Sequence, residues 1–225
     1  MASVSIVGGF ILLLLIAFFL ISQDLAAEDK LPFNKGDAAP SFAVKDSEGK
    51  TYKSEELYKT GPVLLIFYPG DETPGCTKQL CAVRDDYAMF AEHGILPFGV
   101  NNADAESHNR FIEKQDFQFP IFVDEGFKVS KAIGAYKNGD PHITRTVVLV
   151  GKGGKILFYE RGMPEHSAIM NAFHESMGGE CPVCAAAAES AQGAASTAGS
   201  GSANETGCSC GAGCGCGGNP CKCHG

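Results

Sequence analysis

Two cysteines, Cys76 and Cys81, lie five residues apart in the stretch YPGDETPGCTKQLC, and their surroundings favour redox chemistry. The apolar run PVLLIFYP at residues 62–69 precedes them and predicts a buried strand, while the spacing of apolar residues after Cys76 predicts a helix. Cys76 is therefore expected in the first turn of a helix, where free backbone N–H groups favour a thiolate over a thiol. A thiolate in that position is a nucleophile at neutral pH.

Three further residues could complete a pocket around Cys76. Thr73 lies three residues earlier, and its hydroxyl could donate a hydrogen bond to a bound oxygen, while Pro69 ends the strand and could shield the thiolate from water. Arg145 opens the later run RTVVLV, which we expect beside the strand at 62–69, so that the guanidinium faces the thiolate. Taken alone, Arg145 could be a surface ion-pair partner and Cys81 a small buried apolar residue.

The elements that would position these residues alternate between strands and helices. The pattern predicts a hairpin at 40–52, a strand at 62–69, a helix at 76–93, a strand at 95–101, a helix starting at Asp104, a strand at 119–125, a helix at 127–136, a hairpin at 145–162 and a helix at 164–177. This order predicts an α/β domain in which helices flank a mixed central sheet, and it is compatible with a thioredoxin-like fold. His108 would lie on an exposed face of its helix.

Pro69, Thr73 and Cys76 form the P-x-x-x-T-x-x-C signature of peroxiredoxins. The longer stretch FYPGDETPGCTKQLCAVRD, the segment SHNRFIEKQDFQFPIFVDE and Arg145 resemble the peroxiredoxin Q group, also called the bacterioferritin comigratory protein group. The resemblance covers residues 31–177 and implies a thiol-dependent peroxidase, with no cofactor for that reaction, in a domain at 31–178. Gly70 replaces a lysine that is often found after the proline, a departure that bears on substrate preference.

The resemblance also implies a role for each residue. Cys76 would attack hydrogen peroxide or an organic hydroperoxide and become a sulfenic acid, while Thr73 and Arg145 bind and polarise the peroxide oxygens. Cys81 would then form a disulfide with Cys76, and a thioredoxin-like donor would reduce it. The expected partners are a hydroperoxide and this reductant, and the protein is expected to be a monomer.

The spacing of the two cysteines sets a condition on that disulfide. Along an intact helix, five residues rise about 7.5 Å and turn about 140°, which separates the two Cα atoms by about 8.6 Å. A disulfide requires Cα atoms about 4.4–6.8 Å apart. We therefore expect the helix to unwind between Cys76 and about Arg84 before the bond forms.

Eight of the ten cysteines lie in the C-terminal part of the chain. A C-x-x-C motif and a flexible linker of small, polar residues occupy 179–207, and a tail at 208–225 carries three C-x-C pairs and resembles metallothionein. Thiol pairs suit Zn or Cu(I), and a disulfide or redox-relay role, or no role, is the alternative. A metal-binding or metal-storage protein, with the peroxiredoxin domain protective, is the competing function. The candidate ligands are Cys208, Cys210, Cys214, Cys216, Cys221 and Cys223, with Cys181 and Cys184 as further candidates.

The N-terminal residues 1–27 contain an uncharged run, Val4 to Ile21. Its length falls between that of a signal-peptide core, about 7–15 residues, and that of a spanning helix, about 20. We expect a signal anchor or a cleaved signal peptide, and hence a domain that is membrane-anchored or exported to a periplasmic, lumenal or extracellular side; a buried core helix is the other reading. The net charge of −8, without a basic block, argues against a nucleic-acid partner.

Overall fold

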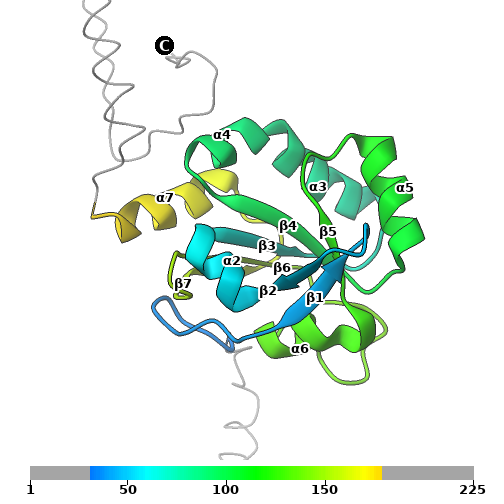
Figure 1. Ribbon diagram of the computed structural model, residues 1–225, viewed down its shortest axis with the longest axis horizontal. Coiled ribbons are helices and arrows are strands. Elements are labelled where there is room, and N and C mark those ends of the chain that lie inside the picture. Colours follow the sequence, from blue (N-terminus) through cyan, green and yellow to red (C-terminus); the bar gives the residue numbers. More distant parts are fainter. Residues whose placement is uncertain (1–30, 179–225) are drawn as a thin grey trace, which may run out of the picture. The chain divides into compact units, whose positions relative to one another are not determined.

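The computed structural model describes residues 31–178 (Figure 1). The predicted signal segment at 1–27, the C-x-x-C motif and linker at 179–207 and the cysteine-rich tail at 208–225 lie outside the described residues. The predictions made for them, including the eight candidate metal ligands, therefore stay predictions.

Strands and helices alternate through the described part of the chain, and Figure 1 labels them. In chain order they are β1 (Ala43–Asp46), β2 (Thr51–Lys53), α2 (Ser54–Thr60), β3 (Val63–Phe67), α3 (Pro74–Asp85), α4 (Tyr87–Glu92), β4 (Leu96–Asn101), α5 (Ala105–Gln115), β5 (Ile121–Val123), a 3-10 turn (Glu125–Phe127), α6 (Lys128–Ile133), β6 (Thr146–Val150), β7 (Ile156–Arg161) and α7 (His166–Ser176).

The strands form one mixed sheet in the order β2-β1-β5-β4-β3-β6-β7. Strands β3, β4 and β5 pair in parallel, whereas β6 pairs antiparallel with both β3 and β7, and β1 pairs antiparallel with β2 and β5. All five residues of β3 are buried, as expected for a central strand that is covered on both faces. The prediction of a mixed central sheet with flanking helices is confirmed.

Helices cover both faces of this sheet. Helices α3, α4, α5 and α7 lie on one face, and α2 and α6 lie on the other (Figure 1). Alternate side chains of β3 point to the first face, where Leu64 and Ile66 pack with Leu80 of α3, Phe111 of α5 and Phe173 of α7. This packing fixes the start of α3 relative to the sheet.

Two element predictions differ from the structure. The helix expected at 76–93 begins earlier, at Pro74, and is interrupted at Asp86, whose φ of −99° and ψ of 12° lie outside the helical range. A proline suits a first turn because its missing N–H would have no partner there. Helix α2 was not predicted, because its seven residues are too few to show a helical period clearly.

Candidate active site

The sheet brings Arg145 to the start of α3, as the order of strands predicted. Strands β3 and β6 pair antiparallel, with Phe67 opposite Thr146. The chain leaves β3 at Phe67 and enters α3 at Pro74, while Arg145 directly precedes β6. The end of β3 and the beginning of β6 share one edge of the sheet, so Cys76 and Arg145 meet although 69 positions separate them in the sequence.

Cys76 is buried in the first turn of α3 and contacts the guanidinium. Its relative exposure is 1%, and Arg145 Nη2 donates a hydrogen bond to Cys76 Sγ over 3.3 Å. Gly75 makes room for this approach, since a Cβ atom there would lie 3.3 Å from Arg145 Nη2. The arrangement places a fixed positive charge and the start of a helix beside one sulfur atom, a combination that stabilises negative charge on it.

Gln79 belongs to this site and was missed in the sequence. It lies one turn after Cys76 on the same face of α3, and its Oε1 accepts a hydrogen bond from Arg145 Nη1. Arg145 therefore spans Cys76 and Gln79 with its two terminal nitrogens. The sequence offered one sign of its role: Gln79 is a polar residue three positions after Cys76, a spacing that places both side chains on the same face of a helix.

The loop before α3 holds the other two predicted site residues. Thr73 is exposed at the N-cap of α3, and its hydroxyl donates to the carbonyl of Gly70 over 3.2 Å. A threonine hydroxyl has a single hydrogen to donate, so donation to a peroxide would require it to turn away from Gly70. Pro69 is half-buried and follows the fully buried Tyr68.

The same loop is tied to α5 through the Asp71 carboxylate. The Tyr68 hydroxyl donates to Asp71 Oδ1 over 2.7 Å, the Ser107 hydroxyl donates to Oδ2 over 2.6 Å, and His108 Nδ1 lies 2.8 Å from Oδ2. The prediction that His108 is exposed was wrong: its relative exposure is 0%, because its face of α5 turns toward Asp71 and the sheet. Ser107 and His108 thus fix the loop that leads to Cys76.

These contacts set the charges of the loop. Burial by itself would raise the pKa of the Asp71 carboxyl, but the hydrogen bond and charge of His108, followed by hydrogen bonds from Ser107 and Tyr68, lower this pKa below its ordinary value of 3.8. Burial, followed by the Asp71 carboxylate and a charge on Cys76, raises the pKa of the Tyr68 phenol well above 10. Tyr68 therefore keeps its proton and serves as a donor to a charged Asp71.

Replacing Asp71 by asparagine is expected to lower the free energy of unfolding by about 2 kcal/mol at pH 7, because an amide cannot replace a carboxylate that accepts three hydrogen bonds. Since the folded pKa lies below 3.8, this stabilisation is complete above that pH and is lost as the pH falls through the folded value. Urea unfolding of both proteins at pH 7 and in acid measures the difference, which should close in acid.

Glu106→Gln is the matched control, since it removes an exposed carboxylate of α5 that pairs with Arg110 over 2.8 Å. Its effect should stay within about 0.5 kcal/mol. A difference between wild type and Asp71→Asn that persisted unchanged in acid would contradict the charge assignment.

Cys81 lies in the middle of α3, half-buried against the core. Its Sγ donates a hydrogen bond to Gln115 Oε1 over 3.4 Å, and α3 is continuous from Pro74 to Asp85. Both Cys76 and Cys81 are free thiols. The structure is therefore that of the reduced form, in which the helix is intact between Cys76 and Cys81.

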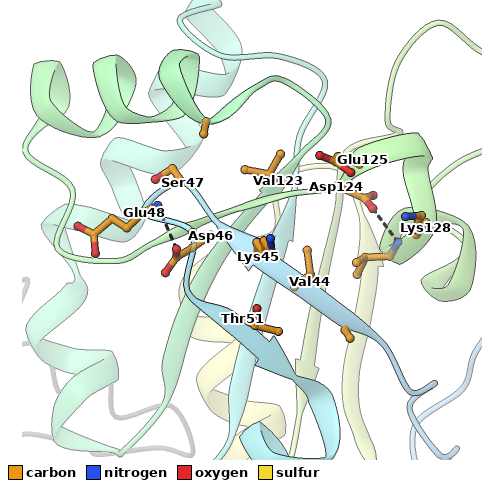
Figure 2. Close-up of a pocket in the computed structure, with 14 residues that line it drawn as sticks. Val44, Lys45, Asp46, Ser47, Glu48, Thr51, Val123, Asp124, Glu125 and Lys128 are labelled. Carbon is orange, nitrogen blue, oxygen red and sulfur yellow. Dashed lines mark hydrogen bonds between the residues drawn. The ribbon is translucent and has the colours of Figure 1, made fainter.

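A separate cavity of about 600 Å³ lies along β1 and the start of α6 (Figure 2), and no residue of α3 lines it. Lys45 and Lys128 line it together with the acidic residues Asp46, Glu48, Asp124 and Glu125. Of the predicted site residues that lie within 31–178, none lines this cavity. Within residues 31–178, no group of three or more His, Cys, Asp or Glu side chains is placed to hold a metal ion.

A family model described as "AhpC/TSA family" matches residues 35–159, more than half of the chain. The chain belongs to the AhpC/TSA family. Chloroplastic peroxiredoxin Q of Populus jackii is 44% identical over 128 residues, which are 56% of this chain and 60% of that protein. Chloroplastic peroxiredoxin Q of Arabidopsis thaliana is 48% identical over 101 residues, 45% of this chain and 46% of that protein. The resemblance to the peroxiredoxin Q group is confirmed, although the AhpC/TSA chain spans only about half of the length of most of these curated relatives.

Solved structures support the same fold. The AhpC/TSA domain resembles the peroxidoxin BcpB of Mycobacterium tuberculosis, with a TM-score of 0.54 and 28% identity over 57% of this chain and 86% of that one. It also resembles a mutant PrxQ of Xylella fastidiosa, with a TM-score of 0.57 and 24% identity over 66% of this chain and 98% of that one. The predicted thioredoxin-like fold is confirmed by these neighbours.

The predicted location is corrected by the comparisons. We expected a membrane-anchored or exported domain, but the peroxiredoxin Q relatives of this AhpC/TSA chain are named as chloroplastic, which contradicts that expectation. The prediction was based on the apolar run at 4–21. It was wrong because hydropathy alone does not identify a compartment. Among the helices of residues 31–178, none has the length and apolar character of a membrane span.

Proposed function

We propose that the domain is a thiol-dependent peroxidase that reduces hydrogen peroxide and organic hydroperoxides through Cys76. The observation that carries this proposal is the 3.3 Å contact between Arg145 Nη2 and Cys76 Sγ at the start of α3. A buried sulfur with a guanidinium and a helix N-terminus beside it is suited to act as a thiolate nucleophile. Membership of the AhpC/TSA family and similarity to proteins named peroxiredoxin Q support the assignment.

In the first step, the Cys76 thiolate attacks one oxygen of the hydroperoxide. A sulfur–oxygen bond forms, the O–O bond breaks, and the second oxygen leaves as water or an alcohol after taking up a proton. Sulfur is oxidised to a sulfenic acid, and the peroxide is reduced by two electrons. Arg145 is positioned to stabilise charge on the departing oxygen, and Thr73 donates to the bound peroxide once its hydroxyl turns from Gly70.

In the second step, the Cys81 thiol attacks the Cys76 sulfenic acid. A disulfide forms, and the sulfenic OH leaves as water with the thiol proton. A thioredoxin-like dithiol then reduces the 76–81 disulfide by exchange and is itself oxidised. The thiols supply both electrons, so this cycle requires no metal or organic cofactor.

The test of this proposal is peroxide turnover by the full-length protein with thioredoxin, thioredoxin reductase and NADPH. We expect NADPH oxidation that depends on the protein, and a disulfide-linked peptide containing Cys76 and Cys81 after one equivalent of peroxide. Peptide mass spectrometry is required because residues 179–225 add eight other cysteines. Peroxide consumption that left Cys76 unmodified would refute the proposal.

Formation of the disulfide is expected to unwind the first turns of α3. In the reduced structure the helix spans Pro74–Asp85 and holds the two cysteine Cα atoms about 8.6 Å apart by helix geometry, beyond disulfide range. Amide hydrogen exchange of residues 76–84 should therefore be at least about tenfold faster in the oxidised protein. Equal protection of this segment in the reduced protein and in the 76–81 disulfide form would contradict the prediction.

The compartment named for the relatives supports a chloroplast location for this domain. Fractionation of source cells, with an antibody raised against residues 31–178, tests it: co-purification with plastids is expected, and enrichment in a plastid-free fraction would overturn it.

A further inference from the structure

The C-terminal end of α5 packs against the part of α3 that must open. Lys114 and Gln115 are the last two residues of α5, and Asp116 ends the helix in the left-handed region, with a φ of 54°. Lys114 Nζ forms an ion pair with Glu72 Oε2 over 2.9 Å, just before α3 begins. The end of α5 therefore contacts the loop that leads into the N-terminus of α3.

Gln115 makes the two contacts that reach the body of α3. Its side-chain Oε1 accepts from Cys81 Sγ over 3.4 Å, and its backbone carbonyl accepts from Arg84 Nη1 over 2.7 Å. The last carbonyls of a helix have no partner within that helix, and a cation is favourable at that end. One residue therefore fastens both the middle and the last turn of α3.

We propose that Gln115 is a positioning residue for Cys81, a latch that holds the second thiol in the closed helix and so limits the rate at which the Cys76 sulfenic acid becomes a disulfide. The inference rests on the proposed function, because it takes Cys81 to be the thiol that attacks the sulfenic acid. For Cys81 to reach Cys76, the contacts of Cys81 and Arg84 with Gln115 must break. The helical hydrogen bonds between Cys76 and Cys81 must break as well.

The latch has a chemical consequence because two reactions compete for the sulfenic acid. Attack by Cys81 gives the disulfide and water. Attack by the sulfenate on a second hydroperoxide gives a sulfinic acid and water or an alcohol, which removes Cys76 from the cycle. While Gln115 holds Cys81 in the intact helix, the sulfenic acid of Cys76 persists for longer. A larger fraction of Cys76 is then oxidised to sulfinic acid at high peroxide concentration.

Replacing Gln115 by alanine in the full-length protein is expected to accelerate disulfide formation about 3- to 10-fold, the effect of losing one neutral hydrogen bond. The peroxide concentration that converts half of Cys76 to sulfinic acid should rise by the same factor. Rapid quenching, alkylation and peptide mass spectrometry measure both quantities. In the reduced protein, amide exchange of residues 76–84 should also become faster, whereas the rate of the first oxidation of Cys76 should not change.

Two variants separate the latch from a general loss of stability. Gln115→Glu keeps an oxygen acceptor at the same place and should restore the wild-type disulfide rate. Gln118→Ala makes the same substitution at an exposed glutamine beyond α5 and should leave every rate unchanged.

Normal oxidation of Cys76 with equal disulfide rates in wild type and Gln115→Ala would overturn the latch alone. A slower rate in Gln115→Ala would also overturn it, because Gln115 would then assist the attack. If Cys76 is not oxidised in any variant, the proposed function fails first, and the latch fails with it.

Discussion

Replacing Cys76 by serine is expected to reduce peroxide turnover at least about 10³-fold, to the rate of the uncatalysed reaction with the other thiols. A serine hydroxyl cannot be oxidised by a peroxide to the equivalent of a sulfenic acid. The residue is buried with its sulfur against Arg145, so serine fits the same space and the fold should survive. Stopped-flow peroxide consumption with the thioredoxin system measures the loss.

Cys81→Ser is the matched variant, since it makes the same change at the second cysteine of α3. It should oxidise Cys76 once at the wild-type rate but should then turn over slowly, because only external thiols can resolve the sulfenic acid. If Cys76→Ser retained turnover within tenfold of wild type, another thiol would carry the reaction, and the assignment of the site would be wrong.

Replacing Arg145 by methionine is expected to slow the oxidation of Cys76 about 100-fold. The change removes the charge and the donor that face Sγ, and it also releases the buried Gln79. Loss of one preorganised donor at a site of developing charge costs about 10²–10³-fold in rate. The second-order rate constant for Cys76 oxidation, taken from peroxide-dependent single turnovers, is the quantity to compare.

Arg145→Lys and Arg110→Met complete this experiment. Lysine keeps the charge but cannot span Cys76 and Gln79 with two nitrogens, so an intermediate loss of about tenfold is expected. Arg110 is exposed on α5 and pairs with Glu106, so its replacement by methionine should leave the rate constant unchanged. Equal rates for the Arg145→Met and wild-type proteins would show that the guanidinium does not assist the attack.

Local patterns in the sequence were sufficient to predict the central strands of the sheet and the meeting of Cys76 and Arg145 in the site. The continuous apolar runs of β3 and β6 identify buried strands, because each is bounded by turn or polar residues and is too short for a helix. Once these strands are neighbours, the positions of Cys76 and Arg145 at their ends bring the two side chains together. The placement of Cys76 in a first helical turn was also readable, although the helix begins two residues earlier than predicted, at Pro74.

Features that depend on contacts between distant segments could not be predicted from the sequence. His108 shows no local sign that it is buried, because its burial arises from Asp71, 37 positions earlier. Gln115 meets Cys81 for the same reason, across 34 positions. The interruption at Asp86 was hidden because the apolar spacing continues across it.

The most direct test of the assignment to Cys76 is to trap its sulfenic acid. The full-length Cys81→Ser protein is mixed with one equivalent of hydrogen peroxide and a cyclic diketone that reacts with sulfenic acids, and the label is located by peptide mass spectrometry. We predict label on Cys76, with formation slowed about 100-fold when Arg145→Met is added. Label on a tail cysteine, with Cys76 recovered as an intact thiol, would contradict the assignment.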